Sequence, residues 1–219
     1  MSHMYIEGVL GAGKSSLLNT IVSECTLTSS LNIVPIYEPV HRFIERKSII
    51  DSTISFNPLK LFKNNKTEGL ACQLHILQVY QHQTKIFSSP KPPVNKVHIW
   101  DRGLSSCLIF SKTMNVLQYL TDLEYDIFQH YYNLAQQESS HIFPKSIIFL
   151  DTPVETCLTR LQARGNDYDE IDHTYLTLLR EKYLQSLKES NCRVNIISGE
   201  NLELSKLTEI VLSEIQAIH

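Results

Sequence analysis

Five short runs rich in isoleucine and valine recur along the chain, separated by longer stretches whose apolar residues are spaced as in helices. The runs cover residues 5–6, 33–37, 97–100, 146–150 and 194–197. Alternation of strand and helix is typical of parallel sheets, and near-continuous apolar runs such as SIIFL fit strands covered on both faces. The sequence therefore predicts an α/β fold with a central parallel sheet of about five strands flanked by helices.

The segments between these runs predict helices and loops. Residues 67–87 and 117–137 each carry apolar side chains at helical spacing, which predicts two amphipathic helices. The prolines of 88–96 indicate a loop, and 56–67 reads as an irregular insertion. A chain of 219 residues suits one domain of medium size, so we expect a single domain over 1–219.

Composition excludes some partners. The net charge is −3, with acids and bases mixed, so no basic stripe is available for nucleic acid or an anionic membrane surface. No apolar run approaches the roughly 18 residues that span a bilayer. Five scattered cysteines without a C-x-x-C pair fit reduced thiols, so we expect a cytoplasmic protein with no membrane or nucleic-acid partner.

The segment GVLGAGKSS follows the first run and precedes a helical pattern. It matches G-x-x-x-x-G-K-[ST], in which backbone N–H groups cradle phosphates at a helix N-terminus. The lysine is expected to reach the β- and γ-phosphates, and the first serine to ligate Mg²⁺, so ATP and Mg²⁺ are the expected cofactors. The loop alone does not separate kinases from motor ATPases, and no N-K-x-D motif supports a GTPase. The residues assigned to the nucleotide are Gly8, Gly11, Ala12, Gly13, Lys14, Ser15 and Ser16.

One acid ends the second run. Glu38 precedes Pro39, and we expect it at the carboxyl end of a strand next to the strand that feeds the phosphate loop. A carboxylate there can accept the proton of a hydroxyl that attacks the γ-phosphate. Without further context, an N-cap for the helical pattern of 41–47 is an equally good interpretation.

The chain resembles deoxynucleoside kinases, cellular and viral, in five blocks in the same order between about 6 and 184. EGVLGAGKSSLL and YEPVHRF resemble the phosphate loop and the Glu-Pro-Val-x-x-Trp segment, and GLACQLHILQVY resembles the base-reading helix. WDRGLSS is similar to the Asp/Glu-Arg-Ser motif, and CLTRLQARGNDYDEIDHTYL to the arginine-bearing lid. The resemblance implies a P-loop kinase with a lid at about 164–172. It also suggests a viral or otherwise divergent member of the family, which would act in the host cytoplasm if it is viral.

The resemblance also implies catalytic roles. Glu38 becomes the general base, Asp101 helps Ser15 to hold Mg²⁺, and Arg102 contacts the 5′-hydroxyl and the transferring phosphoryl group. Arg160 and Arg164 share a helical face and are expected to clamp phosphate, although Asn166 replaces a further arginine and Arg180 is a candidate substitute. The alternatives are a structural Asp-Arg ion pair and a solvated arginine face.

For the substrate, Gln73 matches the glutamine that pairs with the base, and a carboxamide offers one donor group and one acceptor. Relatives that prefer deoxycytidine and purines place Arg and Asp where this chain has Tyr80 and Cys107, so the resemblance favours thymidine. Phe62 replaces a sugar-binding tyrosine, and Asp169, or Glu170 after a one-residue shift, is expected at the 3′-hydroxyl. The expected substrate residues are Glu38, Phe43, Phe62, Gln73, Tyr80, Arg102, Cys107, Phe110 and Asp169.

The sequence thus predicts an ATP- and Mg²⁺-dependent kinase that phosphorylates the 5′-hydroxyl of a deoxynucleoside, with Glu38, Arg102, Lys14 and Arg164 as its catalytic residues. A small-molecule substrate and a homodimer formed through the aromatic-rich segment 122–135 are the expected partners, although that segment would also suit the core. The alternatives are a thymidylate kinase, whose acceptor phosphate would need extra cations such as His41, Arg42 and Arg46, and a non-catalytic subunit with the same fold.

Overall fold

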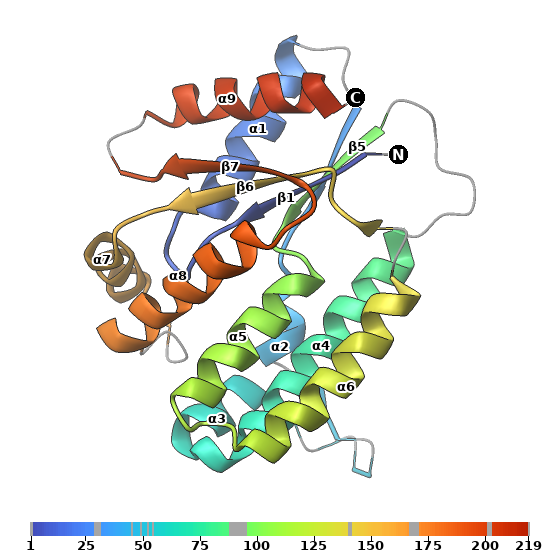
Figure 1. The fold of residues 1–219 in the computed structure, drawn as a ribbon, viewed down its shortest axis with the longest axis vertical. Helices are drawn as coiled ribbons and strands as arrows, with labels where there is room; N and C mark the ends of the chain where they lie inside the picture. Colours follow the sequence, from blue (N-terminus) through green and yellow to red (C-terminus); the bar gives the residue numbers. More distant parts are fainter. Residues whose placement is uncertain are drawn as a thin grey trace.

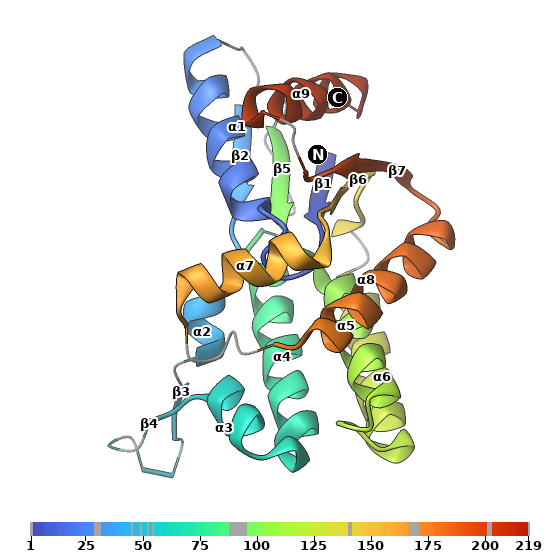
Figure 2. The same cartoon turned by 90° about the vertical axis from the view of Figure 1, so that its left-hand side faces the viewer.

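A central sheet with helices on both faces forms the upper part of the computed structural model (Figure 1). Helices α1 and α9 cover one face, and α8 and α5 lie toward the other, from which α4 and α6 extend away (Figure 2). The structure describes residues 2–28, 32–44, 46–48, 50–51, 53, 55–87, 96–139, 142–166, 171–200 and 203–218.

The five predicted apolar runs form one sheet of five parallel strands in the order β2-β5-β1-β6-β7. Strands β1, β5 and β6 are buried along almost their whole length, which explains why apolar and polar residues do not alternate in their sequences. The predicted fold class is confirmed. The strands are β1 Ser2–Glu7, β2 Asn32–Ile36, β5 Lys96–Asp101, β6 Ser146–Asp151 and β7 Arg193–Ser198.

The position of β5 corrects one expectation. Strand β5 lies between β1 and β2, so Glu38 is not next to the strand that feeds the phosphate loop. The register pairs Ile6 with Asp101, which brings the end of β5 level with the start of the loop. Asp101 and Arg102 are therefore inserted between the loop and Glu38.

The helices follow the predicted spacing with two exceptions described below. A short antiparallel pair, β3 Arg46–Lys47 and β4 Ser55–Phe56, lies apart from the main sheet. The helices are α1 Lys14–Thr28, α2 Val40–Ile44, α3 Pro58–Asn64, the 3-10 helix η1 Lys66–Glu68, α4 Gly69–Phe87, α5 Leu104–Val116, α6 Asp122–Glu138, α7 Val154–Arg164, α8 His173–Lys188 and α9 Leu204–Ile218.

The prediction of an irregular insertion over 56–67 is wrong, because this segment forms α3 and η1. Asn57 caps α3 by accepting a 3.0 Å hydrogen bond from the backbone N of Lys60, and Pro58 occupies the first helical position. Asn65 then caps η1 through the backbone N of Thr67. The predicted loop over 88–95 lies outside the described residues.

The helix predicted from residue 117 begins at Asp122. Thr121 and Glu124 form a capping box, in which the Thr121 hydroxyl accepts from the Glu124 backbone N and the Glu124 carboxylate accepts from the Thr121 backbone N. Residues 117–120 instead turn back onto the end of α5 through hydrogen bonds to the carbonyls of Thr113 and Met114.

Two groups of buried side chains hold the structure together. One fills the space between the sheet and its covering helices, with Ile6, Ile99, Ile148 and Phe149 fully buried. The other packs α4, α5 and α6 together and includes Phe128. Among the described residues, no helix is both long and apolar enough to cross a bilayer.

Candidate active site

The phosphate loop runs from the end of β1 to the start of α1. Gly11 has φ +77°, and a Cβ there would lie 2.6 Å from the carbonyl oxygen of Cys157. Gly13 has φ +102°, which L side chains rarely adopt. Because α1 begins at Lys14, its first backbone N–H groups lie at the loop and are available to an anion.

Lys14 is buried under the loop, and its Nζ donates to the carbonyl oxygen of Val9 at 3.1 Å. Burial, and after it the positive charge of Arg102, lower the pKa of Lys14 to about 8. A cation that has lost most of its water gains more from an incoming anion than an exposed lysine does. The position therefore suits a phosphate-binding lysine.

The Ser15 hydroxyl donates to Oδ2 of Asp101 at 2.5 Å. The other carboxylate oxygen, Oδ1, is buried without a hydrogen-bond partner, and burial raises the pKa of Asp101. A hydroxyl beside an unpartnered carboxylate oxygen fits Mg²⁺, which takes one or two protein ligands plus phosphate oxygens. The described residues contain no group of three or more His, Cys, Asp or Glu side chains that would hold a metal by themselves.

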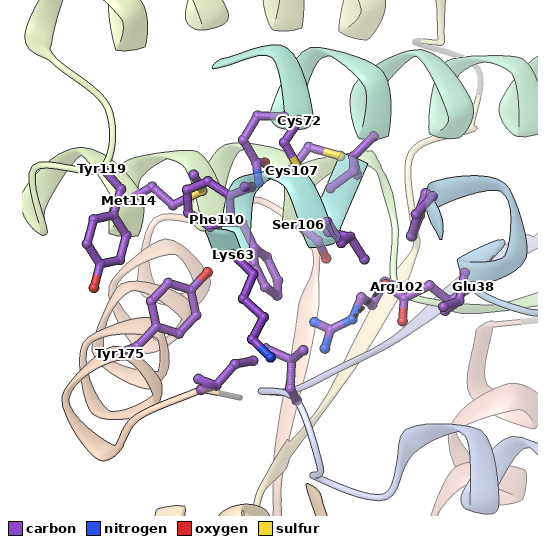
Figure 3. Close-up of a pocket in the computed structure, with 18 of the residues that line it drawn as sticks. Glu38, Lys63, Cys72, Arg102, Ser106, Cys107, Phe110, Met114, Tyr119 and Tyr175 are labelled. Atoms are coloured by element: carbon purple, nitrogen blue, oxygen red, sulfur yellow. Dashed lines mark ion pairs between the residues drawn. The ribbon is translucent and has the colours of Figure 1, made fainter. Parts of the chain in front are cut away.

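Glu38 lines a cavity with its carboxylate, and its backbone lies two residues before the start of α2. Its Oε1 accepts a 3.0 Å hydrogen bond from the Tyr80 hydroxyl. The same oxygen lies 3.2 Å from Nε of Arg102, and Figure 3 shows these two side chains next to each other. The Glu38 carbonyl accepts from the backbone N of Val40 at 2.9 Å. The contacts of the side chain thus differ from those of the N-cap that the sequence left open.

Arg102 lies at the centre of the site in an unusual backbone conformation. Its φ of +67° is rare for a residue with a side chain, and its backbone N is held by the carbonyl of Ile6 at 3.1 Å. The buried guanidinium donates from Nη1 to the Tyr183 hydroxyl at 2.7 Å and lies 5.0 Å from the ring centroid of Phe110. Its partners differ from those of Asp101, so the two neighbours do not form the structural pair considered above.

A buried network behind Arg102 was missed by sequence reasoning. The Tyr183 hydroxyl donates to Oγ of Ser106 at 3.1 Å, and Ser106 donates to Oε2 of Glu7 at 2.7 Å. Oε1 of Glu7 accepts from the backbone N of Gly103 at 3.0 Å. Burial raises the pKa of Glu7, and the charge of Arg102 opposes that shift. The available signal was an acid at the end of an apolar strand, directly before the first glycine of the loop.

A cavity of about 250 Å³ joins these groups to the predicted substrate residues. Leu10 of the phosphate loop lines it on one side. Asp169 and its alternative Glu170 lie outside the described residues. The predicted residues that line the cavity are Glu38, Phe43, Phe62, Gln73, Tyr80, Arg102, Cys107, Phe110 and Arg164.

One part of the cavity is walled by neutral side chains around a single amide. Oε1 of Gln73 is buried without a hydrogen-bond partner. The rings of Phe43 and Tyr80 lie 5.6 Å apart, and burial raises the pKa of Cys72 to about 12, so this thiol stays neutral. A buried acceptor without a partner calls for a donor from a ligand.

The region near Phe62 carries cations that the sequence did not assign. Phe62 packs edge-on against Tyr119 with centroids 5.9 Å apart, and Nζ of Lys66 lies 4.4 Å from the Phe62 centroid. Lys63 extends from α3 into the cavity (Figure 3). Tyr175 from α8 points into the same space. Local sequence patterns do not predict that Lys63 and Tyr175 line the cavity, because they reach it only through the packing of α3 against α4 and of α8 against α5.

The two arginines predicted to clamp phosphate, Arg160 and Arg164, lie at different parts of the site. Nη1 of Arg160 donates to the carbonyls of Gly11 and Ala12 at 3.3 and 3.2 Å, whereas Arg164, in the last turn of α7, lines the cavity. Arg180 makes a two-bond ion pair with Asp151 at 2.5 and 2.7 Å, so its guanidinium is already engaged at the end of β6. Residues 167–170 of the expected lid lie outside the described residues.

Comparison with known proteins agrees with this geometry. Deoxycytidine kinase 2 of Gallus gallus is 26% identical over 217 residues, which cover 90% of this chain and 77% of that protein. A deoxyguanosine kinase of Lactobacillus johnsonii is 26% identical over 194 residues, which cover 86% and 74%. The deoxyadenosine kinase from M. mycoides, solved with bound dATP, superposes with a TM-score of 0.76 at 19% identity over 99% of this chain and all of that one. Residues 4–218 match the model of the deoxynucleoside kinase family, and the chain therefore belongs to that family.

Proposed function

We propose that the protein transfers the γ-phosphoryl group of ATP to the 5′-hydroxyl of a deoxynucleoside in a Mg²⁺-dependent reaction, with thymidine as the preferred acceptor. The single observation that carries the proposal is that one cavity contains the Glu38 carboxylate, the Arg102 guanidinium and the unpartnered Gln73 oxygen, and also borders the phosphate loop at Leu10. A base-reading amide, an acid and a phosphate site on one cavity suit a nucleoside 5′-kinase.

In this reaction Glu38 accepts the proton of the 5′-hydroxyl, a role worth roughly 10²–10⁴ in rate. Arg102 lies beside that carboxylate and supplies positive charge to the transferring phosphoryl group. Lys14 leaves its bond to the Val9 carbonyl and binds the β- and γ-phosphates. Most of the acceleration comes from positioning and charge, since phosphoryl transfer needs little covalent chemistry from the protein.

Ser15 and Asp101 would hold Mg²⁺, and the chemistry that the ion supplies when bound is charge neutralisation on the triphosphate. The unpartnered Oδ1 of Asp101 supports this assignment. The other loop residues, including Ser16 in the first turn of α1, contribute backbone N–H groups.

Thymidine preference rests on the neutral walls around Gln73. The Gln73 Oε1 can accept the N3–H of thymine while its Nε2 donates to O4. Cys107 is small, and burial keeps its pKa above the ordinary thiol value, so it presents no anion to an amino group. The relatives named above are deoxycytidine, deoxyguanosine and deoxyadenosine kinases. A preference for thymidine would therefore distinguish this chain from these relatives.

For the sugar and the lid, we assign the 3′-hydroxyl to Asp169 and lid closure to about 164–172, within one domain over 1–219. Phe62 lines the cavity without a hydroxyl, so one hydrogen bond to the sugar is missing, at a cost of about 0.5–1.5 kcal/mol. Discrimination against 3′-deoxy analogues should accordingly be weak. A Phe62→Tyr variant whose 3′-deoxy discrimination equals that of the wild type would contradict the assignment.

A monophosphate kinase is the second candidate, because Lys63 and Lys66 line the same cavity. These are the cations that an acceptor phosphate needs, whereas His41 and Arg42, considered from the sequence, are exposed on α2 and are not among the residues lining it. Steady-state kcat/KM values for thymidine, deoxycytidine, deoxyadenosine, deoxyguanosine and thymidine monophosphate decide between them. We expect thymidine to give the highest value. A higher value for the monophosphate would replace the proposal, and absence of ADP formation with every acceptor would favour a non-catalytic subunit.

We also propose a homodimer that forms through α6. Its inner face packs against α4 and α5 through Phe128 and Tyr132, while Leu123, Tyr131 and Leu134 are 70%, 51% and 45% exposed. These three residues recur at helical spacing and form one apolar stripe. Light scattering should give twice the mass of one chain, and Leu134→Glu should reduce it to one.

A further inference from the structure

Tyr80, which lines the cavity together with Gln73, also contacts the carboxylate of Glu38, the proposed general base. Tyr80 comes from α4, is 2% exposed, and donates its hydroxyl to Oε1 of Glu38 at 3.0 Å. Its ring is packed near Phe43 with centroids 5.6 Å apart. A phenol fixed at both its ring and its hydroxyl holds its partner in one orientation.

The second contact of the carboxylate goes to the same oxygen. Nε of Arg102 lies 3.2 Å from Oε1 of Glu38. Within the part of the chain that the structure describes, both contacts of this carboxylate are to Oε1, and the side chain keeps 26% of its surface exposed on the cavity. Oε2 is therefore the oxygen left for an acceptor hydroxyl.

We propose that Tyr80 is a positioning residue that, together with Arg102, holds Oε1 of Glu38 so that Oε2 receives the proton of the acceptor. The inference rests on the proposed kinase function. In the step, the 5′-hydroxyl proton passes to Oε2 and the 5′-oxygen forms a bond to the γ-phosphorus. The bond from that phosphorus to the β,γ-bridging oxygen breaks, and ADP leaves with the electron pair. Tyr80 touches none of the reacting atoms.

The surroundings keep the phenol a donor. Burial raises the pKa of Tyr80 well above its ordinary value, and the negative charge of Glu38 raises it further. Titratable groups that interact electrostatically with Glu38 include Lys14, Tyr80, Asp101, Arg102, Cys107 and Tyr183. The same cavity is also lined by Lys63, Lys66, Cys72, Arg164, Asp172 and Tyr175.

The test is Tyr80→Phe, which keeps the ring and removes the hydroxyl. Single-turnover rates of phosphoryl transfer are measured from pH 5 to pH 9, and KM for thymidine is measured in steady-state assays over the same range. We expect the rate to fall about threefold to tenfold, the worth of one hydrogen bond, with KM for thymidine changed less than about twofold. The acidic limb of the profile should move by about half a pH unit to higher pH, because a carboxylate that loses a donor is protonated more readily.

Tyr132→Phe is the matched control, since it makes the same change at a buried tyrosine of the same helical cluster, and it should leave the rate and the acidic limb unchanged. A second variant with 3-fluorotyrosine at position 80 retains the donor and should retain both properties. An unmoved acidic limb in Tyr80→Phe, or a loss confined to KM, overturns the positioning role and leaves Tyr80 as a wall. A wild-type protein that forms no ADP with any nucleoside would overturn the proposed function itself, and the positioning role with it.

Discussion

Replacing Tyr183 by phenylalanine tests the buried network behind Arg102. The Tyr183 hydroxyl accepts a 2.7 Å hydrogen bond from the guanidinium and donates a 3.1 Å hydrogen bond to Ser106, and all three side chains are buried. A hydrogen bond to a charged group contributes about 1.5–3 kcal/mol and a neutral one about 0.5–1.5 kcal/mol. Because the two bonds share one atom and are not additive, we expect the free energy of unfolding to fall by about 3 kcal/mol.

For a chain of this size, each kcal/mol lowers Tm by about 2–4 °C, so the variant should melt about 6–12 °C below the wild type. Differential scanning calorimetry without nucleotide measures this directly, with urea unfolding as a second readout. Nucleoside-dependent kcat should also fall, since Arg102 loses the partner that fixes its guanidinium.

The matched control is Tyr125→Phe on α6. Among the residues that the structure describes, its hydroxyl makes one hydrogen bond, which it accepts from Nε2 of Gln129 at 3.3 Å. Its Tm should change by less than about 2 °C. If Tyr183→Phe melted within the same range as this control, the hydrogen bonds of the Tyr183 hydroxyl would contribute nothing measurable to stability.

Four other outcomes follow from the loop and the metal site. Because the pKa of Lys14 is about 8, kcat/KM for ATP should decline as pH rises through 8, and Lys14→Arg should lack that decline in a profile up to pH 9.5. Between pH 8 and the ordinary pKa of lysine, Lys14 is protonated in the unfolded chain but largely deprotonated in the folded protein. Its contribution to the free energy of unfolding should therefore rise with pH in this range, which denaturant unfolding at several pH values measures. Asp101→Asn should raise the Mg²⁺ concentration for half-maximal rate by about tenfold, the worth of one charged ligand, and an unchanged Mg²⁺ titration would remove Asp101 from the site. Gly11→Ala places a Cβ 2.6 Å from the Cys157 carbonyl at φ +77°, so ATP binding by calorimetry should weaken at least about tenfold; wild-type affinity would contradict this packing.

The parts of the fold that depend on local pattern were predictable. Apolar runs gave all five strands, and the phosphate loop was predicted from eight consecutive residues. Strand order was not, because apolar periodicity carries no information on which parallel strands are neighbours. That is why the insertion of β5, with Asp101 and Arg102 at its end, was missed. Helix α3 could have been predicted from the sequence, since Asn57 followed by Pro58 is a start signal for a helix.

The site divides in the same way. Motif residues such as Lys14 and Glu38 were predicted as candidates from their sequence context. The hydrogen bonds that hold them were not, because Glu7 and Ser106 are 99 residues apart, and Arg102 and Tyr183 are 81 apart. Such contacts are set by packing of the sheet against α5 and α8, which no local spacing records.

In the proposed reaction Glu38 takes the proton of the acceptor hydroxyl, and Glu38→Gln removes that base. The substitution keeps the size of the side chain and an acceptor for the Tyr80 hydroxyl, so ATP and thymidine should bind as in the wild type by isothermal titration calorimetry. We expect kcat for ADP formation to fall by at least about a hundredfold. Near-normal turnover with unchanged binding would contradict this role of Glu38.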